Sequence, residues 1–187
     1  MTHGPTELPP DLPRPEDGGG CAHPAGRSLQ SVALEATTGR AVDVSSVPAR
    51  WVVMYVYPRT GVPGVEMPEG WDAIPGARGC TPQSCSYRDE FEAFRRLDAS
   101  VFGLSTQTAD AQREFASREH IPFALLSDAD RVFGSALKLP TFTVERAVLY
   151  KRVTLVAQRG LIEHVRYPVF PPNEDALETL KWLRANS

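Results

Sequence analysis

The sequence has no apolar run longer than a β-strand, whereas a helix that crosses a bilayer needs about 20 mostly apolar residues. It also lacks a positive excess and any basic block, because 20 Lys and Arg stand against 23 Asp and Glu, for a net charge of -3. Nucleic acid and anionic lipid surfaces attract proteins through clustered positive charge. We therefore expect no membrane and no nucleic acid among the partners of this protein.

Two further features are missing from the chain. It does not open with a positively charged start followed by an apolar stretch, which is the pattern of a secretory leader. It has three cysteines, an odd number that does not suggest a framework of structural disulfides. We therefore expect a cytoplasmic location, in which thiols stay reduced unless they take part in a redox cycle.

The composition favours one globular domain after an irregular arm. At 187 residues, with 42% hydrophobic residues, the chain is long enough for one proper core. Residues 1–27 are rich in proline and glycine and poor in large apolar residues, so they should form an irregular or partly disordered arm, with residues 28–187 as the domain. Cys21 and His23 within the arm are too few ligands for a metal site, and no metal is expected.

The apolar pattern of the rest of the chain alternates between strand-like and helix-like segments. Residues 51–57 are almost continuously apolar and β-branched or aromatic, as in a strand covered on both faces. Residues 101–105 read as the next strand and residues 108–120 as a surface helix, and a right-handed crossover would make the two strands parallel. Residues 147–157 and 161–170 predict an antiparallel pair. The sequence thus predicts an α/β fold with a central mixed sheet flanked by helices.

Cys80 and Cys85 lie at the predicted start of a helix over residues 81–97. Thr81 is a good N-cap and Pro82 suits the first helical position, while Tyr87, Phe91 and Phe94 recur at helical spacing. A thiol at a helix start lies near unpaired backbone N–H groups and the positive end of the helix dipole. Both favour the thiolate, which is the nucleophilic form of cysteine.

The spacing of the two cysteines sets a geometric condition on any bond between them. Helical residues five apart are rotated by about 140° and separated by roughly 7.5 Å along the axis, whereas a disulfide needs Cα atoms about 4.4–6.8 Å apart. If both cysteines are helical, this turn must unwind before Cys80 and Cys85 can join. The alternatives are two buried small apolar residues, or a zinc site, for which the chain lacks a second ligand pair.

Several stretches in the same order resemble one known family. Residues 79–91, with Gly-Cys-Thr followed by Cys85 and by Tyr-Arg-Asp-Glu-Phe, resemble the active-site helix of peroxiredoxins of the bacterioferritin-comigratory (Q) type. Residues 51–58 resemble the strand that leads into the active-site loop of that family. Three further stretches resemble the family and follow in the same order along the chain: residues 101–105, 121–130 and 152–156. The resemblance covers about residues 28–165.

The resemblance implies a thioredoxin-like fold and thiol-dependent reduction of hydrogen peroxide or organic hydroperoxides. By position, Cys80 would be the peroxidatic cysteine and Cys85 the resolving cysteine that closes an intramolecular disulfide with it. Arg152 would stabilise the thiolate and the peroxide oxygens. Such an enzyme needs no prosthetic group, because sulfur does the chemistry, and it implies a thioredoxin-like protein as reductant. We expect a monomer or a homodimer.

Arg152 is also notable without the resemblance. It lies in an otherwise apolar strand pattern, where a buried cation is unfavourable unless it meets an anion. That anion is either the Cys80 thiolate or one of the acidic side chains.

The chain departs from the family pattern just before Cys80. The family loop runs Pro-x-x-x-Thr/Ser-x-x-Cys, whereas here Pro58 and Thr60 are separated from Cys80 by an apparent insertion, residues 62–78, and Ala77 stands three places before the cysteine. Thr60 could fold back to supply the hydroxyl. The insertion is rich in proline and glycine and should be a loop.

The insertion carries Met67, Trp71 and Ile74, which could cover the mouth of the site, bind an organic substrate or anchor the loop to the core. The departure leaves two other functions open. One is a peroxiredoxin-like enzyme repurposed for a specific organic substrate. The other is a non-catalytic redox-sensing or chaperone-like binding module.

Overall fold

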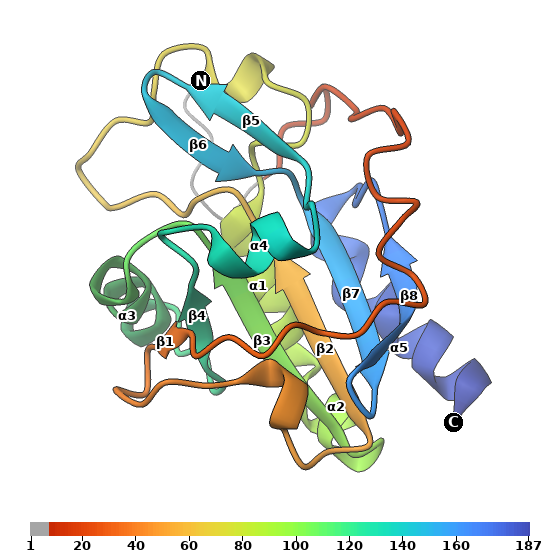
Figure 1. The fold of residues 1–187 in the computed structure, drawn as a ribbon. Coiled ribbons are helices and arrows are strands. Elements are labelled where there is room, and N and C mark those ends of the chain that lie inside the picture. Colours follow the sequence, from red (N-terminus) through yellow and green to blue (C-terminus); the bar gives the residue numbers. More distant parts are fainter. Residues whose placement is uncertain (1–7) are drawn as a thin grey trace.

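The computed structural model describes residues 8–187 as a mixed β-sheet with helices on both faces, which confirms the expected fold class (Figure 1). The sheet has the strand order β1-β4-β3-β2-β7-β8. Its strands are β1 (Glu35–Ala36), β2 (Trp51–Val56), β3 (Ala99–Ser105), β4 (Leu125–Ser127), β7 (Val153–Gln158) and β8 (Leu161–Arg166). Strands β2, β3 and β4 are parallel neighbours, whereas β1, β7 and β8 pair antiparallel.

The central strand β2 divides the protein into two cores. All six of its residues are buried, as the near-continuous apolar pattern predicts. Because side chains alternate along a strand, Val52, Met54 and Val56 enter one hydrophobic cluster, and Trp51, Val53 and Tyr55 enter the other. The second cluster also contains Cys80, so the candidate site borders the core that the helices cover.

Within the described residues, five α-helices flank the sheet: α1 (Cys80–Asp89), α2 (Phe91–Arg96), α3 (Ala109–Arg118), α4 (Val132–Ala136) and α5 (Asp175–Asn186). In Figure 1, α1, α2 and α5 lie behind the sheet, whereas α4 and the N-terminal segment cross in front of it. Tyr87, Phe94 and Leu180 from the helices behind are fully buried in the second cluster. Three short 3-10 helices occur in the loops: η1 (Val44–Ser46), η2 (Trp71–Ala73) and η3 (Pro172–Glu174).

The helix expected over about residues 81–97 is two helices, of which the first begins at Cys80. Helix α1 ends at Asp89, and α2 begins at Phe91 after a break at Glu90, which has φ −95° and ψ 5°. The N-cap is Gly79 rather than Thr81. Gly79 has φ 105°, and a Cβ there would collide with Pro172, so the site requires glycine in this position. Cys80 is therefore the first residue of α1.

The strand predicted over residues 147–157 is also divided. Strand β6 (Ala147–Tyr150) pairs with β5 (Thr141–Val144) in a separate two-stranded sheet. Strand β7 begins at Val153, so Lys151 and Arg152 form the junction between the two sheets. At this junction the side chain of Arg152 binds backbone carbonyls of the insertion, which are more than 70 residues earlier in the chain.

The described part of the N-terminal arm, residues 8–27, contains turns and bends and packs on the domain. The amide of Gly26 donates to the carbonyl of Ile162 at 2.8 Å, and Cys21 is buried in the first cluster. Residues 1–7 of the expected arm lie outside the described residues. The division into a separate arm and a domain stays a prediction.

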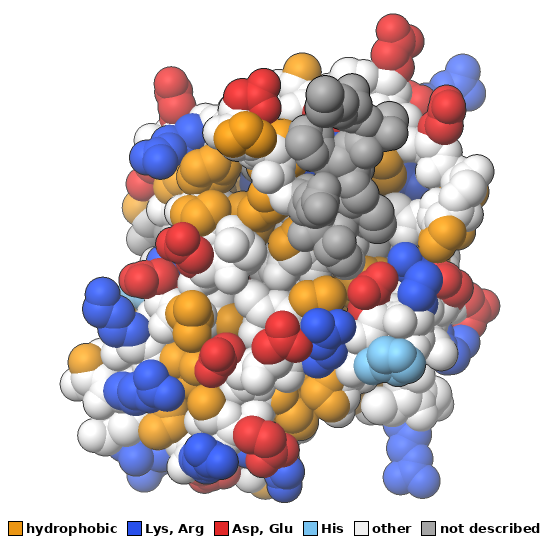
Figure 2. Space-filling view, turned by 180° about the vertical axis from the view of Figure 1, so that it is seen from behind, with side chains coloured by type: hydrophobic (Ala, Val, Ile, Leu, Met, Phe, Trp, Pro, Cys, Tyr) orange, Lys and Arg blue, Asp and Glu red, His pale blue; other side chains and the backbone are white. Residues whose placement is uncertain are grey.

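The surface carries charges of both signs. Figure 2 shows Lys and Arg side chains lying among Asp and Glu side chains over the face seen from behind. Within residues 8–187, none of the helices combines the length and the apolar character that crossing a membrane would require.

Candidate active site

Cys80 begins α1 and is 4% exposed. Its Sγ lies 3.6 Å from the carbonyl oxygen of Ala77, the residue three places earlier. Because Cys80 is the first residue of the helix, its sulfur lies at the end of α1 where backbone N–H groups have no carbonyl partner within the helix. Such an end favours negative charge, which suits a thiolate.

Arg152 brings a cation to the same sulfur. Its Nη2 lies 3.4 Å from Cys80 Sγ, and its Nη1 donates to Oε1 of Gln83. The same Nη2 also donates, at 3.1–3.3 Å, to three successive carbonyl oxygens: those of Gly76, Ala77 and Arg78. Arg152 is buried, and these contacts hold its guanidinium against the chain segment that delivers Cys80. The structure thus brings together two of the four predicted site residues.

Gln83 links Arg152 to a buried acid. Its Nε2 donates to Oδ2 of Asp175 at 2.8 Å, which leaves its Oε1 facing Arg152. The same Oδ2 accepts from Thr154 at 2.6 Å and from Tyr87 at 3.0 Å. On its other oxygen, Asp175 lies 3.2 Å from Nε of Arg166, within ion-pair distance although not aligned for a hydrogen bond. Of the two anions that the sequence left open for Arg152, the sulfur is the one it contacts directly. Among the described residues Arg152 forms no ion pair with a carboxylate, and Asp175 is reached only through Gln83.

Thr60 lies in the same region but faces another partner. Its hydroxyl donates to Oε1 of Gln107 at 3.2 Å, and its amide donates to the same oxygen at 2.8 Å. Thr60 lines the pocket that contains Cys80, yet no hydrogen bond joins the two residues in the described part of the chain. The hydroxyl that the family pattern places near the sulfur is therefore not supplied by Thr60 in this conformation.

A pocket of about 780 Å³ opens in front of Cys80, and the insertion forms much of its wall. Apolar side chains of the insertion dominate that wall: Val62, Val65, Met67 and Trp71. Val65 is 61% exposed, whereas Trp71 is buried against Phe142 and Leu149 of the β5–β6 hairpin. Trp71 therefore anchors the loop, one of the two roles expected from the sequence, and also borders the pocket. Binding of an organic substrate by the insertion stays a prediction.

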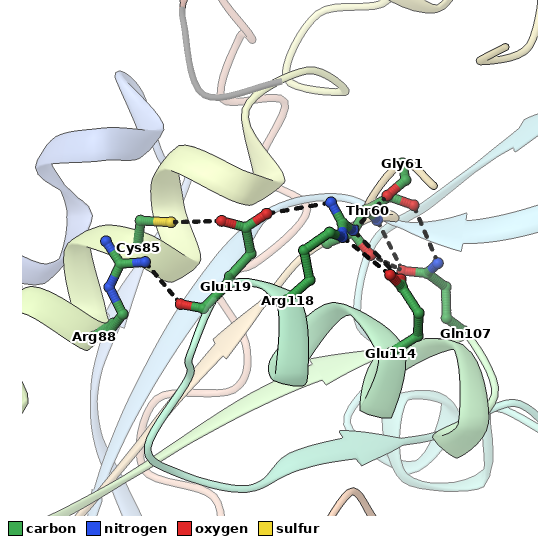
Figure 3. Close-up of polar contacts among 8 residues, drawn as sticks. All are labelled: Thr60, Gly61, Cys85, Arg88, Gln107, Glu114, Arg118 and Glu119. Atoms are coloured by element: carbon green, nitrogen blue, oxygen red, sulfur yellow. Dashed lines mark hydrogen bonds and ion pairs between the residues drawn. The ribbon is translucent and has the colours of Figure 1, made fainter. Parts of the chain in front are cut away.

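Cys85 lies on α1 among charged groups rather than beside Cys80. Its Sγ lies 3.8 Å from Oε2 of Glu119, near the end of α3 (Figure 3). Burial raises the pKa of Cys85, and the negative charges of Glu119 and Asp89 raise it further, while Arg88 opposes them. All three cysteines are free thiols in this structure, with both Cys80 and Cys85 in an intact helix.

Cys21 and His23 form no site with each other. The ring nitrogen Nε2 of His23 hydrogen-bonds to the carbonyl of Leu137 at 2.8 Å. Burial, followed by the charge of Asp17, raises the pKa of Cys21 to about 12, so its thiol stays protonated at neutral pH.

Sequence reasoning missed three residues of this site: Gln83, Glu119 and Asp175. Gln83 had a usable signal, because a residue three places after Cys80 shares its helix face. Asp175 and Glu119 had no such signal, since each reaches the site from a distant helix.

Comparisons with known proteins agree with this geometry. The sequence model of the Redoxin family matches residues 24–181. The chain is 30% identical to "Peroxiredoxin Q, chloroplastic" of Oryza sativa subsp. japonica over 161 residues, which cover 86% of this chain and 66% of the rice protein. It is also 30% identical over 153 residues to "Peroxiredoxin Q, chloroplastic" of Sedum lineare, covering 81% of this chain and 73% of that protein. The chain thus spans just under two thirds of the length of the rice relative.

Among solved structures, the fold is similar to that of peroxidoxin BcpB from Mycobacterium tuberculosis. The TM-score is 0.71 at 25% sequence identity, and the match covers 87% of this chain and 97% of that one. The thioredoxin-like fold that the sequence implied is therefore confirmed.

Proposed function

The chain belongs to the redoxin family and, within it, to the Q-type peroxiredoxins, and on this premise we propose that it is a thiol peroxidase whose attacking group is Cys80. The observation that carries the proposal is the position of Cys80 Sγ at the start of α1, 3.4 Å from Nη2 of Arg152. A helix start and a guanidinium both stabilise negative charge on sulfur.

The first step is attack of the Cys80 thiolate on the terminal oxygen of a peroxide. A bond forms between sulfur and that oxygen, the O–O bond breaks, and the other oxygen leaves and takes a proton to become water or an alcohol. Cys80 is left as a sulfenic acid. Arg152 is proposed to hold the thiolate and the peroxide oxygens during this step, using its planar array of donors.

In the second step, Cys85 resolves the sulfenic acid. Its sulfur attacks Cys80, an S–S bond forms, the S–O bond breaks, and water leaves. Because helical residues five apart are too far from each other for a disulfide, the first turn of α1 must open before this step. An external dithiol then returns both thiols by exchange, and we propose a thioredoxin-like protein in this role. The proposed location is cytoplasmic, and the enzyme is a monomer or a homodimer.

The pocket supports organic hydroperoxides as the preferred substrates. Its volume of about 780 Å³ exceeds what hydrogen peroxide needs, and Val62 and Val65 offer exposed apolar surface at its mouth. Apolar contact of this kind is worth about 0.8 kcal/mol per buried methylene group. We therefore expect kcat/KM to be higher for cumene hydroperoxide than for hydrogen peroxide.

A second candidate function is a specific reaction of an organic substrate other than peroxide reduction. It is favoured by one observation, the hydroxyl of Thr60 that faces Gln107 instead of Cys80, together with Ala77 three places before the cysteine. A non-catalytic redox-sensing module would form the disulfide but show no turnover.

The test of the proposed function is rapid mixing of reduced protein with one equivalent of hydroperoxide. Cys80→Ser should reduce peroxide consumption to the background rate. Cys85→Ser should react once and leave a sulfenic acid at position 80 that dimedone traps. Slow oxidation of well-folded protein by every hydroperoxide would favour the second candidate, and a disulfide without turnover under any dithiol would favour the redox sensor.

The pocket has its own test in a pair of matched variants. Val65→Ser should lower kcat/KM for cumene hydroperoxide by about 3- to 10-fold and leave the value for hydrogen peroxide unchanged, because only the larger substrate loses apolar contact. Val132→Ser is the control, since Val132 is also exposed but lies in α4, outside the pocket. Equal losses for both substrates in Val65→Ser would contradict a role in substrate selection.

A further inference from the structure

Cys85, the proposed resolving cysteine, faces the carboxylate of Glu119, which has no role in the two steps described above. Cys85 Sγ lies 3.8 Å from Oε2 of Glu119, in a geometry that allows the thiol to donate to the carboxylate (Figure 3). The two side chains come from different helices, since Glu119 caps the end of α3. Glu119 is mostly buried, with 15% of its side chain exposed.

Glu119 is held in place from both sides. Arg118 Nη1 lies 3.2 Å from Oε1, the oxygen that does not face Cys85. The backbone carbonyl of Glu119 accepts from Arg88 Nη1 at 2.7 Å, which ties the end of α3 to α1 one turn after Cys85. The result is a thiol, a carboxylate and an orienting cation in a row, the arrangement that activates nucleophiles in many enzymes.

Arg118 also connects this row to the peroxide pocket. Its Nη2 donates to the carbonyl of Gly61 at 3.0 Å, and both residues line the pocket in front of Cys80. Glu114 also accepts from Arg118, from Nε at 3.0 Å and from Nη2 at 3.4 Å. The carboxylate beside Cys85 is therefore positioned by a residue that borders the place where the peroxide binds.

The chemistry of resolution needs a proton acceptor at this place. The thiolate is the attacking form of sulfur, yet the surroundings of Cys85 hold it as a thiol. Burial is the largest cause of its raised pKa, and Glu119 and Asp89 add to it against the opposing charge of Arg88. Tyr55 also interacts electrostatically with Cys85, but burial raises the pKa of Tyr55 and keeps its hydroxyl protonated. A thiol in these surroundings attacks readily only if its proton has somewhere to go.

We propose that Glu119 is the general base that accepts the proton of Cys85 as this sulfur attacks the Cys80 sulfenic acid. The inference rests on the proposed function, because it assigns a role within the resolving step. The S–H proton passes to Oε2 of Glu119, and the electron pair of sulfur forms the S–S bond. The S–O bond of Cys80 breaks, and the departing hydroxide takes the proton from Glu119 and leaves as water.

The first turn of α1 can open without separating this pair. Cys85 lies in the second half of α1, next to Arg88, whose bond to the carbonyl of Glu119 anchors that half to α3. The turn that must unwind begins at Gly79 and Cys80, five residues earlier. Cys80 then approaches Cys85 while Cys85 keeps its contact with the base.

The experiment separates the two steps in rapid-quench samples of the full-length reduced protein. After mixing with one equivalent of cumene hydroperoxide, mass spectrometry follows both dimedone-trapped Cys80 and the peptide linked through Cys80 and Cys85. Glu119→Gln keeps the shape of the side chain but removes the base. Disulfide formation at pH 7 should become about 100-fold slower, a typical loss for a general base, while sulfenic acid forms at the original rate.

Controls distinguish a base from a structural contact. Glu114→Gln removes another carboxylate partner of Arg118 without touching Cys85, and both steps should stay within twofold of the original rates. Glu119→Asp keeps a carboxylate and should recover part of the loss. In Glu119→Gln, the rate of disulfide formation should rise about tenfold per pH unit, because only the thiolate now reacts, whereas the unaltered protein should show a flatter profile.

The outcomes are distinct. An unchanged or faster disulfide step in Glu119→Gln would overturn the role of Glu119 and leave the proposed peroxidase intact. Absence of both the sulfenic acid at Cys80 and the Cys80–Cys85 disulfide in the unaltered protein would overturn the peroxidase and the base together.

Discussion

The two cysteines of α1 lie on one helix in opposite electrostatic surroundings. Cys80, at the start of the helix, is almost fully buried and has the guanidinium of Arg152 at 3.4 Å. Cys85, in the second half, is half-buried and has the carboxylate of Glu119 at 3.8 Å. Cys80 thus faces a cation, whereas Cys85 faces an anion together with the opposing charge of Arg88, so the same residue type is placed for two different tasks.

The two ends of α1 also differ in the contacts that hold each cysteine in place. The Cys80 end is fixed by a buried chain of contacts, from Arg152 through Gln83 to Asp175. The Cys85 end is fixed by Arg118 and Arg88, both partly exposed on the surface of α3 and α1. Buried polar networks are costly to break, whereas partly exposed pairs contribute little to stability. We therefore expect substitutions around Cys80 to lower both the reaction rate and the free energy of unfolding. Substitutions around Cys85 should mainly lower the reaction rate.

The largest effect on the reaction of Cys80 with peroxide should come from replacing the guanidinium group of Arg152. Arg152→Lys keeps the charge but loses the planar array that binds three carbonyls and the sulfur. Reaction of the reduced protein with peroxide should slow by about 100-fold, as when a single preorganised donor is lost from an active site. Stopped-flow kinetics measures this, with Arg146→Lys, an exposed arginine of the β5–β6 turn, as the control. Equal rates in both variants would remove Arg152 from the site.

The next effect concerns the acid behind Cys80. Asp175→Ala leaves Arg166 without its buried partner and three donors without their acceptor, so the free energy of unfolding should fall by about 3–5 kcal/mol. Glu178→Ala is the matched control, since Glu178 lies 3.9 Å from the same arginine on the surface and should cost under about 1 kcal/mol. Urea unfolding compares the two, and equal losses would mean that the buried network does not stabilise the Cys80 end.

The smallest effect involves the third thiol, Cys21, whose pKa is raised by burial and by the negative charge of Asp17. The pKa of about 12 in the folded protein lies above that of an unfolded thiol, about 8.5. The folded state therefore retains the proton longer, so this contribution to stability is complete below about pH 8.5 and is lost as the pH rises toward 12. The unfolding free energy should fall more steeply above about pH 9 in the original protein than in Cys21→Ser.

Cys21→Ser should also leave peroxide turnover unchanged, because Cys21 lies in the first cluster, away from Cys80 in the second. Parallel pH profiles of stability, or a loss of turnover in this variant, would contradict this reading of Cys21.

Much of the fold follows from local patterns in the sequence. Residues 51–57 could be recognised as a central strand because both faces of β2 are buried, and residues 108–120 as a helix because Thr108 caps α3 with its side chain. The position of Cys80 near a helix start also follows from local signals. The exact N-cap does not, because Gly79 is required by the nearby Pro172, which is more than 90 residues away in the chain.

The parts that could not be predicted depend on tertiary contacts. The break at Lys151 and Arg152 reflects carbonyls of the insertion that the arginine binds, and nothing in the strand pattern signals it. The partner of Thr60 is Gln107, which lies after β3, so the direction of the hydroxyl was not readable from the loop before Cys80. The roles of Cys80, Cys85, Arg152 and Thr60 stay predictions until they are measured.

The most direct test of the account is the location of the bond formed after one turnover. Reduced protein is mixed with one equivalent of hydroperoxide without added reductant, the free thiols are alkylated, and the peptides are mapped by mass spectrometry without reduction. The account predicts one intramolecular bridge between Cys80 and Cys85, with Cys21 alkylated. A bridge that includes Cys21, or an oxidised protein in which Cys80 is still alkylated, would contradict it.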